Sequence, residues 1–211
     1  LHNEDIIRQL DLHLGDRVNV EKAGEIIPQI VGVAKEQRDA HLGAPVEFVH
    51  ECPECGTPLV RYEGEAATYC PNDACPPQRK GRIEHFIARD AMNIKSLGPE
   101  VVDKYYENGL VRDVTDLYRL QLTEWDGHWF LSRGTFTPPT LGEALETQAP
   151  AMPVTKVATQ KIVKAIEDSK SVPFDRLLFA LGSRFVGKGA AKALAAQFKT
   201  LAALRVASFD E

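Results

Sequence analysis

The chain has 211 residues, of which 44% are hydrophobic and 26% are charged, and its formal net charge is −5. This composition is ordinary for a folded protein and excludes a disordered or fibrous chain, while the length allows roughly one to three domains. The N-terminus has no basic and apolar leader, and no apolar run reaches the length of a membrane span. We therefore expect a cytoplasmic protein with no membrane partner. A start without Met is expected of a fragment of a longer protein.

The acidic average hides a basic C-terminal part. Between Lys161 and Arg205 basic residues recur along the chain, and the acidic residues there are Glu167, Asp168 and Asp175. Lys and Arg side chains neutralise nucleic-acid phosphates, so this part can meet DNA although the whole chain is acidic. A solvated helix surface is the alternative interpretation.

The first part of the chain predicts a small all-β unit. Residues 6–35 read as short strands: residues 17–21 alternate apolar and polar side chains, and residues 25–33 form a second apolar run after a turn that ends at Gly24. Pro28 lies within the second run and favours an edge strand or a β-bulge. Residues 34–45 are polar and predict a connector.

From Gly81 onward the apolar period becomes helical. Ile83, Phe86, Ile87 and Ala91 recur at helical spacing among basic neighbours, so a helix is predicted directly after the cysteines. Further helices are predicted at residues 101–108, 114–120, 159–169, 174–181, 190–198 and 201–207.

Both tryptophans lie in one segment that interrupts these helices. Between Thr123 and Pro139 the sequence has no clear period. An aromatic-rich segment of this kind predicts an irregular insert with its own small aromatic cluster rather than a binding site.

All the cysteines lie in one stretch, CPECGTPLVRYEGEAATYCPNDAC. Cys52 and Cys55 form a C-x2-C pair, and Cys70 and Cys75 form a C-x4-C pair after a spacer of hairpin length. Two such pairs let four sulfurs converge on one zinc ion, and four thiolates leave no open position for catalysis. We predict a structural zinc site, with two disulfides or a redox pair at Cys52 and Cys55 as the alternatives.

Two later stretches resemble each other, at residues 94–102 and 183–191. Each places an apolar residue and then a glycine, Gly98 or Gly187, in a tight turn just before a helix. This is the layout of a helix-hairpin-helix, in which glycine lets the backbone approach a phosphate and the next helix presents its N–H groups. A third copy at residues 154–163 has Thr155 in place of the glycine, and we expect it to pack without gripping phosphate.

The order of these parts resembles the C-terminal half of a bacterial NAD-dependent DNA ligase. The similarity rests on the LHN start, GDRVNVEKAGEIIPQIV, the four cysteines followed by IEHFIAR, and FALGSRFVG. Such enzymes of replication and repair adenylate a lysine from NAD, transfer AMP to the 5′ phosphate of a nick and join it to the 3′ hydroxyl. The lysine lies in a K-x-D-G motif, which this chain lacks.

The resemblance implies a multidomain α+β fold. It places part of an OB-fold β-barrel at residues 1–45, a four-cysteine zinc finger at 46–80 and an all-α helix-hairpin-helix domain at 81–211 with an insert near 123–152. It also implies that the four cysteines bind zinc. The DNA-binding residues that it implies, together with those expected from the hairpins and their charges, are Lys22, Lys95, Gly98, Arg184, Gly187, Lys188, Gly189 and Lys192.

The expected function is sequence-independent clamping of nicked double-stranded DNA through its phosphate backbone. No catalytic residue is expected in this chain, and the chain alone should be inactive; NAD and magnesium would serve only the parent enzyme, a monomer. The alternatives are a free-standing zinc and helix-hairpin-helix DNA-binding module and a subunit of a DNA-repair nuclease. A β-barrel and a cysteine segment just upstream of the hairpins favour the ligase.

Overall fold

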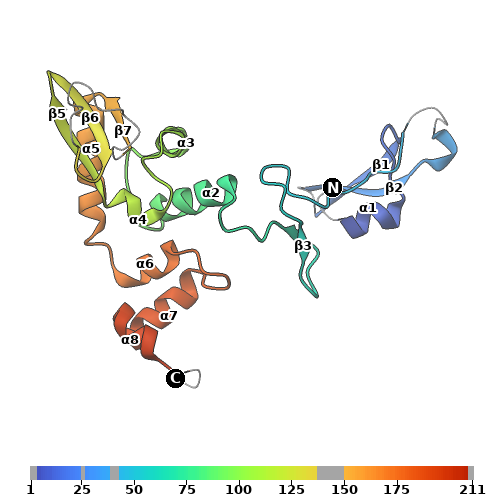
Figure 1. The fold of residues 1–211 in the computed structure, drawn as a ribbon. Coiled ribbons are helices and arrows are strands. Elements are labelled where there is room, and N and C mark those ends of the chain that lie inside the picture. Colours follow the sequence, from blue (N-terminus) through green and yellow to red (C-terminus); the bar gives the residue numbers. More distant parts are fainter. Residues whose placement is uncertain (1–3, 25–26, 39–42, 137–149, 209–211) are drawn as a thin grey trace. The chain divides into compact units, whose positions relative to one another are not determined.

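We describe the protein from a computed structural model, which describes residues 4–24, 27–38, 43–136 and 150–208. The chain forms two compact units, Leu1–Cys75 and Pro76–Glu211, and each is described by itself (Figure 1).

The first unit begins with a helix, α1 (Glu4–Leu10), where the sequence pattern predicted a strand from residue 6. That part of the prediction is wrong. Glu4 and Asp5 lie in the first turn, where carboxylates complement the helix dipole, and Arg8 forms an i,i+4 ion pair with Glu4 at 2.5 Å. Ile7 provides the buried contact of the helix.

Two strands follow α1, β1 (Val18–Ala23) and β2 (Ile27–Val33), and they pair in antiparallel fashion. Pro28 lies opposite Lys22 in a two-stranded sheet, so the predicted edge position is confirmed. The register of the strand pair shifts elsewhere, between Asn19 and Val20. Such an irregularity increases local twist, as the corners of a partial barrel require.

The short 3₁₀ helix η1 (Lys35–Gln37) is followed by a residue that binds a buried carboxylate nearer the start of the unit. The side chain of Asp16 is 1% exposed and accepts a hydrogen bond from Arg38 Nε at 2.8 Å. Arg38 also donates to the carbonyl oxygen of Asp11 at 2.6 Å. The hydrogen bond from Arg38 lowers the pKa of Asp16, so the carboxylate stays charged where it is held.

A second pair of short strands, β3 (Val60–Arg61) and β4 (Thr68–Tyr69), forms the hairpin between the two cysteine pairs. The guanidinium of Arg61 forms an ion pair with Asp5 of α1, which joins this hairpin to the rest of the first unit.

The second unit is mainly helical. Its helices are α2 (Pro76–Ile87), α3 (Pro99–Glu107), α4 (Val114–Leu117), α5 (Lys156–Ser169), α6 (Phe174–Ala180), α7 (Lys188–Phe198) and α8 (Leu201–Val206). Each predicted helix is present, with ends shifted by up to three residues except at α2, which begins at Pro76 directly after Cys75. The helices surround a core whose innermost side chains are Ile83, Val102, Leu110, Leu117 and Leu131.

A three-stranded antiparallel sheet lies among these helices. The prediction that residues 81–211 form an all-α domain is therefore wrong in this respect. The strands are β5 (Leu120–Trp125), β6 (His128–Arg133) and β7 (Ala151–Val154), in the order β5-β6-β7. Figure 1 shows α5 running beside this sheet. The sheet contributes Leu131, which is fully buried, to the core of the unit.

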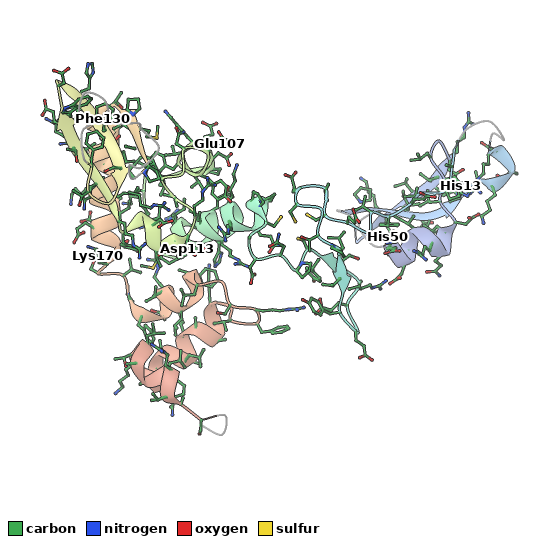
Figure 2. All side chains as sticks on the ribbon, in the orientation of Figure 1. His13, His50, Glu107, Asp113, Phe130 and Lys170 are labelled. Carbon is green, nitrogen blue, oxygen red and sulfur yellow. The ribbon has the colours of Figure 1, made fainter. Side chains whose placement is uncertain are left out.

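The expected irregular insert is in large part the β5–β6 hairpin. Asp126 and Gly127 both have positive φ, 47° and 71°, as a two-residue type I′ turn requires. The predicted aromatic cluster is present: Phe130 stacks on Phe136 at 5.2 Å and lies 5.9 Å from Trp125 (Figure 2). Residues 137–149 of the insert expected near 123–152 lie outside the described residues.

Candidate zinc site and nucleic-acid interface

Four thiols meet at one point in the first unit. Cys52 and Cys55 lie in a turn closed by a hydrogen bond from Gly56 N to Cys52 O at 2.8 Å, with Gly56 at φ 67°. Cys70 directly follows β4, and Cys75 ends a turn in which its N–H donates to the carbonyl oxygen of Asn72 at 3.0 Å. The β3–β4 hairpin therefore brings the two cysteine pairs to the same place.

The spacing of the sulfurs fits a metal and not a disulfide. All four Sγ atoms lie within 4.8 Å of one another, with Cys52 and Cys75 at 3.8 Å and Cys55 and Cys70 at 3.5 Å. A disulfide needs about 2.05 Å between sulfurs. Four sulfurs at a tetrahedral distance from one zinc ion are separated by about 3.8 Å. The four thiols thus already have the arrangement of a closed four-cysteine zinc site.

The thiols differ in how readily they lose a proton. Hydrogen bonds with the side chain and the backbone of Thr57 lower the pKa of Cys55 to about 6. Burial and the neighbouring sulfurs raise the pKa of Cys75 to about 12. Zinc is bound by thiolates, and burying several negative thiolates together is unfavourable. A cation at the centre of the cluster would offset this electrostatic cost.

The two predicted hairpins lie in the second unit and share one backbone conformation. Positive φ occurs at Ser96 (65°) and at Phe185 (67°), each two residues before a glycine. Each glycine then caps the next helix in extended conformation, Gly98 with φ −98° and ψ 177° and Gly187 with φ −76° and ψ 179°. The similarity of the two sequence stretches is therefore a similarity of structure.

A second pair of equivalent residues with positive φ precedes the two hairpins. Asn93 has φ 53° and Gly182 has φ 65°, and each lies five residues before its hairpin glycine. Gly182 packs closely on α2, since an added Cβ would lie 3.3 Å from Cδ2 of His85. His85 Nε2 also lies within hydrogen-bond distance, 2.9 Å, of the carbonyl oxygen of Phe179. These contacts hold the second hairpin against the helix that leads into the first.

A cleft of about 410 Å³ lies between the segment that follows α2, helix α6 and the first turn of α7. Lys188, the first residue of α7, reaches across it and donates to Asp90 Oδ2 at 2.5 Å. The guanidinium of Arg176 donates to the carbonyl oxygen of Arg89. Most of its charged lining residues are basic, and the full lining is Arg89, Asp90, Asn93, Asp175, Arg176, Phe179, Lys188 and Lys192.

The predicted DNA-binding residues of the second unit lie at or beside the hairpins. Those exposed to solvent are Lys95, Arg184, Gly187, Lys188, Gly189 and Lys192, while Gly98 is half-buried. Lys22 is exposed on β1 of the first unit. The third copy of the template departs at two places: Thr155 caps α5 without a side-chain hydrogen bond, and Pro153 before it belongs to β7.

Several residues of this interface were not predicted. Asp90 and Arg89 follow α2, and Arg176 and Phe179 lie on α6, so they join Lys188 only through tertiary packing. Phe185 stood within the hairpin motif, but the pattern gave no reason to single it out. The sequence feature that could have identified it is an aromatic residue at the position where the first hairpin has Ser96.

Comparison with known proteins agrees with this arrangement. The OB-fold domain of NAD-dependent DNA ligases matches residues 1–42, their C4 zinc finger domain matches residues 51–76, and a helix-hairpin-helix motif matches residues 176–211. Proteins named DNA ligase are similar over the whole chain: those of Phocaeicola vulgatus and Bacteroides fragilis are 53% and 49% identical over 211 residues, and that of Parabacteroides distasonis is 49% identical over 212.

The chain is similar to one segment of NAD-dependent DNA ligases. It spans 28% of the length of these relatives. Within the chain the zinc-finger match contains all four cysteines, and the motif match contains the hairpin of Gly187. The hairpin of Gly98 lies outside the three matched ranges, so its assignment as a second copy rests on backbone geometry. Among the described residues, none of the helices is long and apolar enough to cross a membrane.

Proposed function

We propose that this chain is the DNA-clamping segment of an NAD-dependent DNA ligase, which holds a nicked duplex while another segment of the protein carries out adenylation. The observation that carries the proposal is the pair of hairpins with one backbone conformation, each with exposed basic side chains at or beside it. Sequence-independent binding needs this kind of contact, because phosphates position a protein on DNA without reporting the base sequence.

Each hairpin would meet the DNA backbone through its glycine. An added Cβ at Gly187 or at Gly189 would have no atom within 4 Å, so both glycines face open space that a phosphate can enter. The first turn of α7 would supply N–H groups and the positive end of the helix dipole. Lys188 and Lys192, one turn apart on α7, would neutralise neighbouring phosphates.

The four cysteines would hold a structural zinc ion. With every ligand position taken by sulfur, the ion would supply no chemistry beyond cross-linking the segment between β2 and α2. The proposed domain limits are 1–45, 46–80 and 81–211; α2 begins at Pro76, so the second limit falls inside a helix. We also propose that the parent enzyme is a monomer that uses NAD and magnesium in the bacterial cytoplasm, and that this chain alone forms no lysine adenylate.

DNA binding by the full chain tests the proposal. We expect it to bind nicked duplexes of unrelated sequence with equal affinity, and the logarithm of the affinity to fall linearly with the logarithm of salt concentration. Fluorescence anisotropy with labelled duplexes gives both quantities. Binding to one base sequence in preference to the others would favour a free-standing zinc and helix-hairpin-helix DNA-binding module, and no binding at low salt would overturn the proposal.

Metal removal tests the zinc site separately. We expect about one zinc ion per chain by elemental analysis, and loss of structure at residues 52–75 on chelation, because so small a segment has little apolar core of its own. Cys75→Ser should have the same effect, whereas Tyr62→Ser on the exposed β3–β4 hairpin should leave the zinc content unchanged. A zinc-free chain with the same protection from hydrogen exchange at residues 52–75 would rule the site out.

A further inference from the structure

The tip of the second hairpin carries an aromatic ring in an unusual setting. Phe185 is 88% exposed, more than any other large hydrophobic residue among those described. Its φ is 67°, in the left-handed region that bulky side chains rarely adopt. The position therefore combines a local backbone cost with an apolar ring in water, and neither helps the fold.

The turn itself does not require an aromatic residue. Ser96 occupies the equivalent position of the first hairpin with φ 65°, so the same backbone forms around a small polar side chain. Phe185 is not part of the apolar core, and the contact described for its ring is the guanidinium of Arg184, 5.0 Å from the ring centroid. A cation stacked on an aromatic ring leaves the opposite face of the ring available to a partner.

The surroundings of Phe185 select the chemistry of that partner. From Arg176 to Arg205 the chain contains no acidic residue, and Lys188 and Lys192 lie on the helix that the hairpin leads into. A polyanion with apolar surface between its charges fits such a tip. Duplex DNA has this form, since its grooves expose sugar and base edges between two rows of phosphates.

We propose that Phe185 enters the minor groove of the duplex and packs its ring against deoxyribose and base edges. This inference rests on the proposed function, because the phosphate contacts of the same hairpin would place the ring. The minor groove, about 6 Å wide, admits a single ring while basic side chains beside it reach both phosphate rows. The hairpin would thus add an apolar contact to binding that is otherwise electrostatic.

The test compares DNA binding by the full chain and by three variants. Phe185→Ser copies the residue of the first hairpin, Phe185→Trp keeps a large ring, and Val206→Ser removes another exposed apolar side chain of the second unit, 84% exposed. We expect Phe185→Ser to lower affinity for a nicked duplex about tenfold with an unchanged salt dependence, because the ring neutralises no phosphate. Phe185→Trp and Val206→Ser should bind as the original chain does.

Four results decide the inference. A minor-groove ligand such as netropsin should weaken binding by the original chain more than binding by Phe185→Ser, and the thermal midpoint of Phe185→Ser should not fall, because the ring is exposed. Equal affinity of Phe185→Ser and the original chain would overturn the role of the ring and leave DNA clamping intact. Absence of DNA binding by the original chain itself would overturn the proposed function, and the inference with it.

Discussion

The hairpin around Gly98 and the hairpin around Gly187 have the same φ pattern and the same extended glycine before a helix, yet their surroundings differ. In the first hairpin Ile94 and Leu97 are buried in the core, and α3 carries Glu100, Asp103 and Glu107 against Lys104. The second hairpin has exposed residues at its tip, and α7 carries lysines and no acidic residue.

The comparison separates two uses of one motif. A hairpin whose apolar residues are buried and whose helix is acidic is suited to joining α2 and α3 within the core. A hairpin whose residues face solvent beside basic side chains is suited to meeting phosphates. Backbone conformation alone therefore does not identify a DNA contact, and the side chains around it decide. We infer that the second hairpin provides most of the binding free energy.

The largest effect should follow from removing the charge of the second hairpin. Replacing Arg184, Lys188 and Lys192 together by Gln should lower affinity for nicked duplex by about two orders of magnitude and reduce the salt slope by roughly 2 to 3. Lys95→Gln in the first hairpin should lower the affinity for nicked duplex only severalfold. The matched control replaces Lys161, Lys164 and Lys170, on or beside α5, by Gln. The comparison fails if Lys95→Gln or the control weakens binding as strongly as the hairpin variant does.

A smaller effect should come from one methyl group on α7. Gly189→Ala should raise the free energy of unfolding by about 0.5 kcal/mol, because Ala favours helix more than Gly does. The same methyl group should lower DNA affinity about tenfold by keeping the DNA backbone at a distance. Gly81→Ala on α2 is the matched control, since an added Cβ at either glycine meets open space.

Thermal unfolding and DNA binding measured on these two variants separate stability from contact. Both should be more stable than the original chain, and only Gly189→Ala should bind DNA less tightly. A Gly189→Ala chain with full affinity would mean that the DNA backbone does not approach α7 closely at this residue.

Local patterns were enough to predict the helices of the second unit and the meeting of the cysteines. Ile83, Phe86 and Ile87 define an apolar helix face by their spacing, and all three are buried. The four thiols lie in one short stretch, so their convergence depends on one hairpin between Cys55 and Cys70. In both cases the information lies within about twenty residues, where sequence patterns are most reliable.

The missed features have two physical causes. α1 and the β5–β6 hairpin were misread from short patterns, although acidic residues at Glu4 and Asp5 and the Asp126-Gly127 pair are local signals of a helix start and a type I′ turn. The cleft could not be read locally at all. Asp90 and Lys188 are 98 residues apart in the chain and meet only because the core packs α2 against α6.

The smallest effect should come from Asp90, which holds Lys188 across the cleft. The hydrogen bond from Lys188 lowers the pKa of Asp90. The ion pair is therefore fully present at neutral pH and is lost only as pH falls below the ordinary range of a carboxyl group. If Lys188 contacts a phosphate as proposed, DNA must first displace the Asp90 carboxylate from it.

Asp90→Asn should therefore increase affinity for nicked duplex about two- to fivefold, since an exposed ion pair of this kind is weak. Asp168→Asn is the matched control, because Asp168 pairs with Lys164 on α5 at 3.1 Å, also at the surface. Changing pH between about 6 and 8 should not reproduce the effect, because Asp90 stays charged over that range. Weaker binding by Asp90→Asn would instead mean that Asp90 orients Lys188 toward the DNA, and the carboxylate would then be a positioning group rather than a competitor of phosphate.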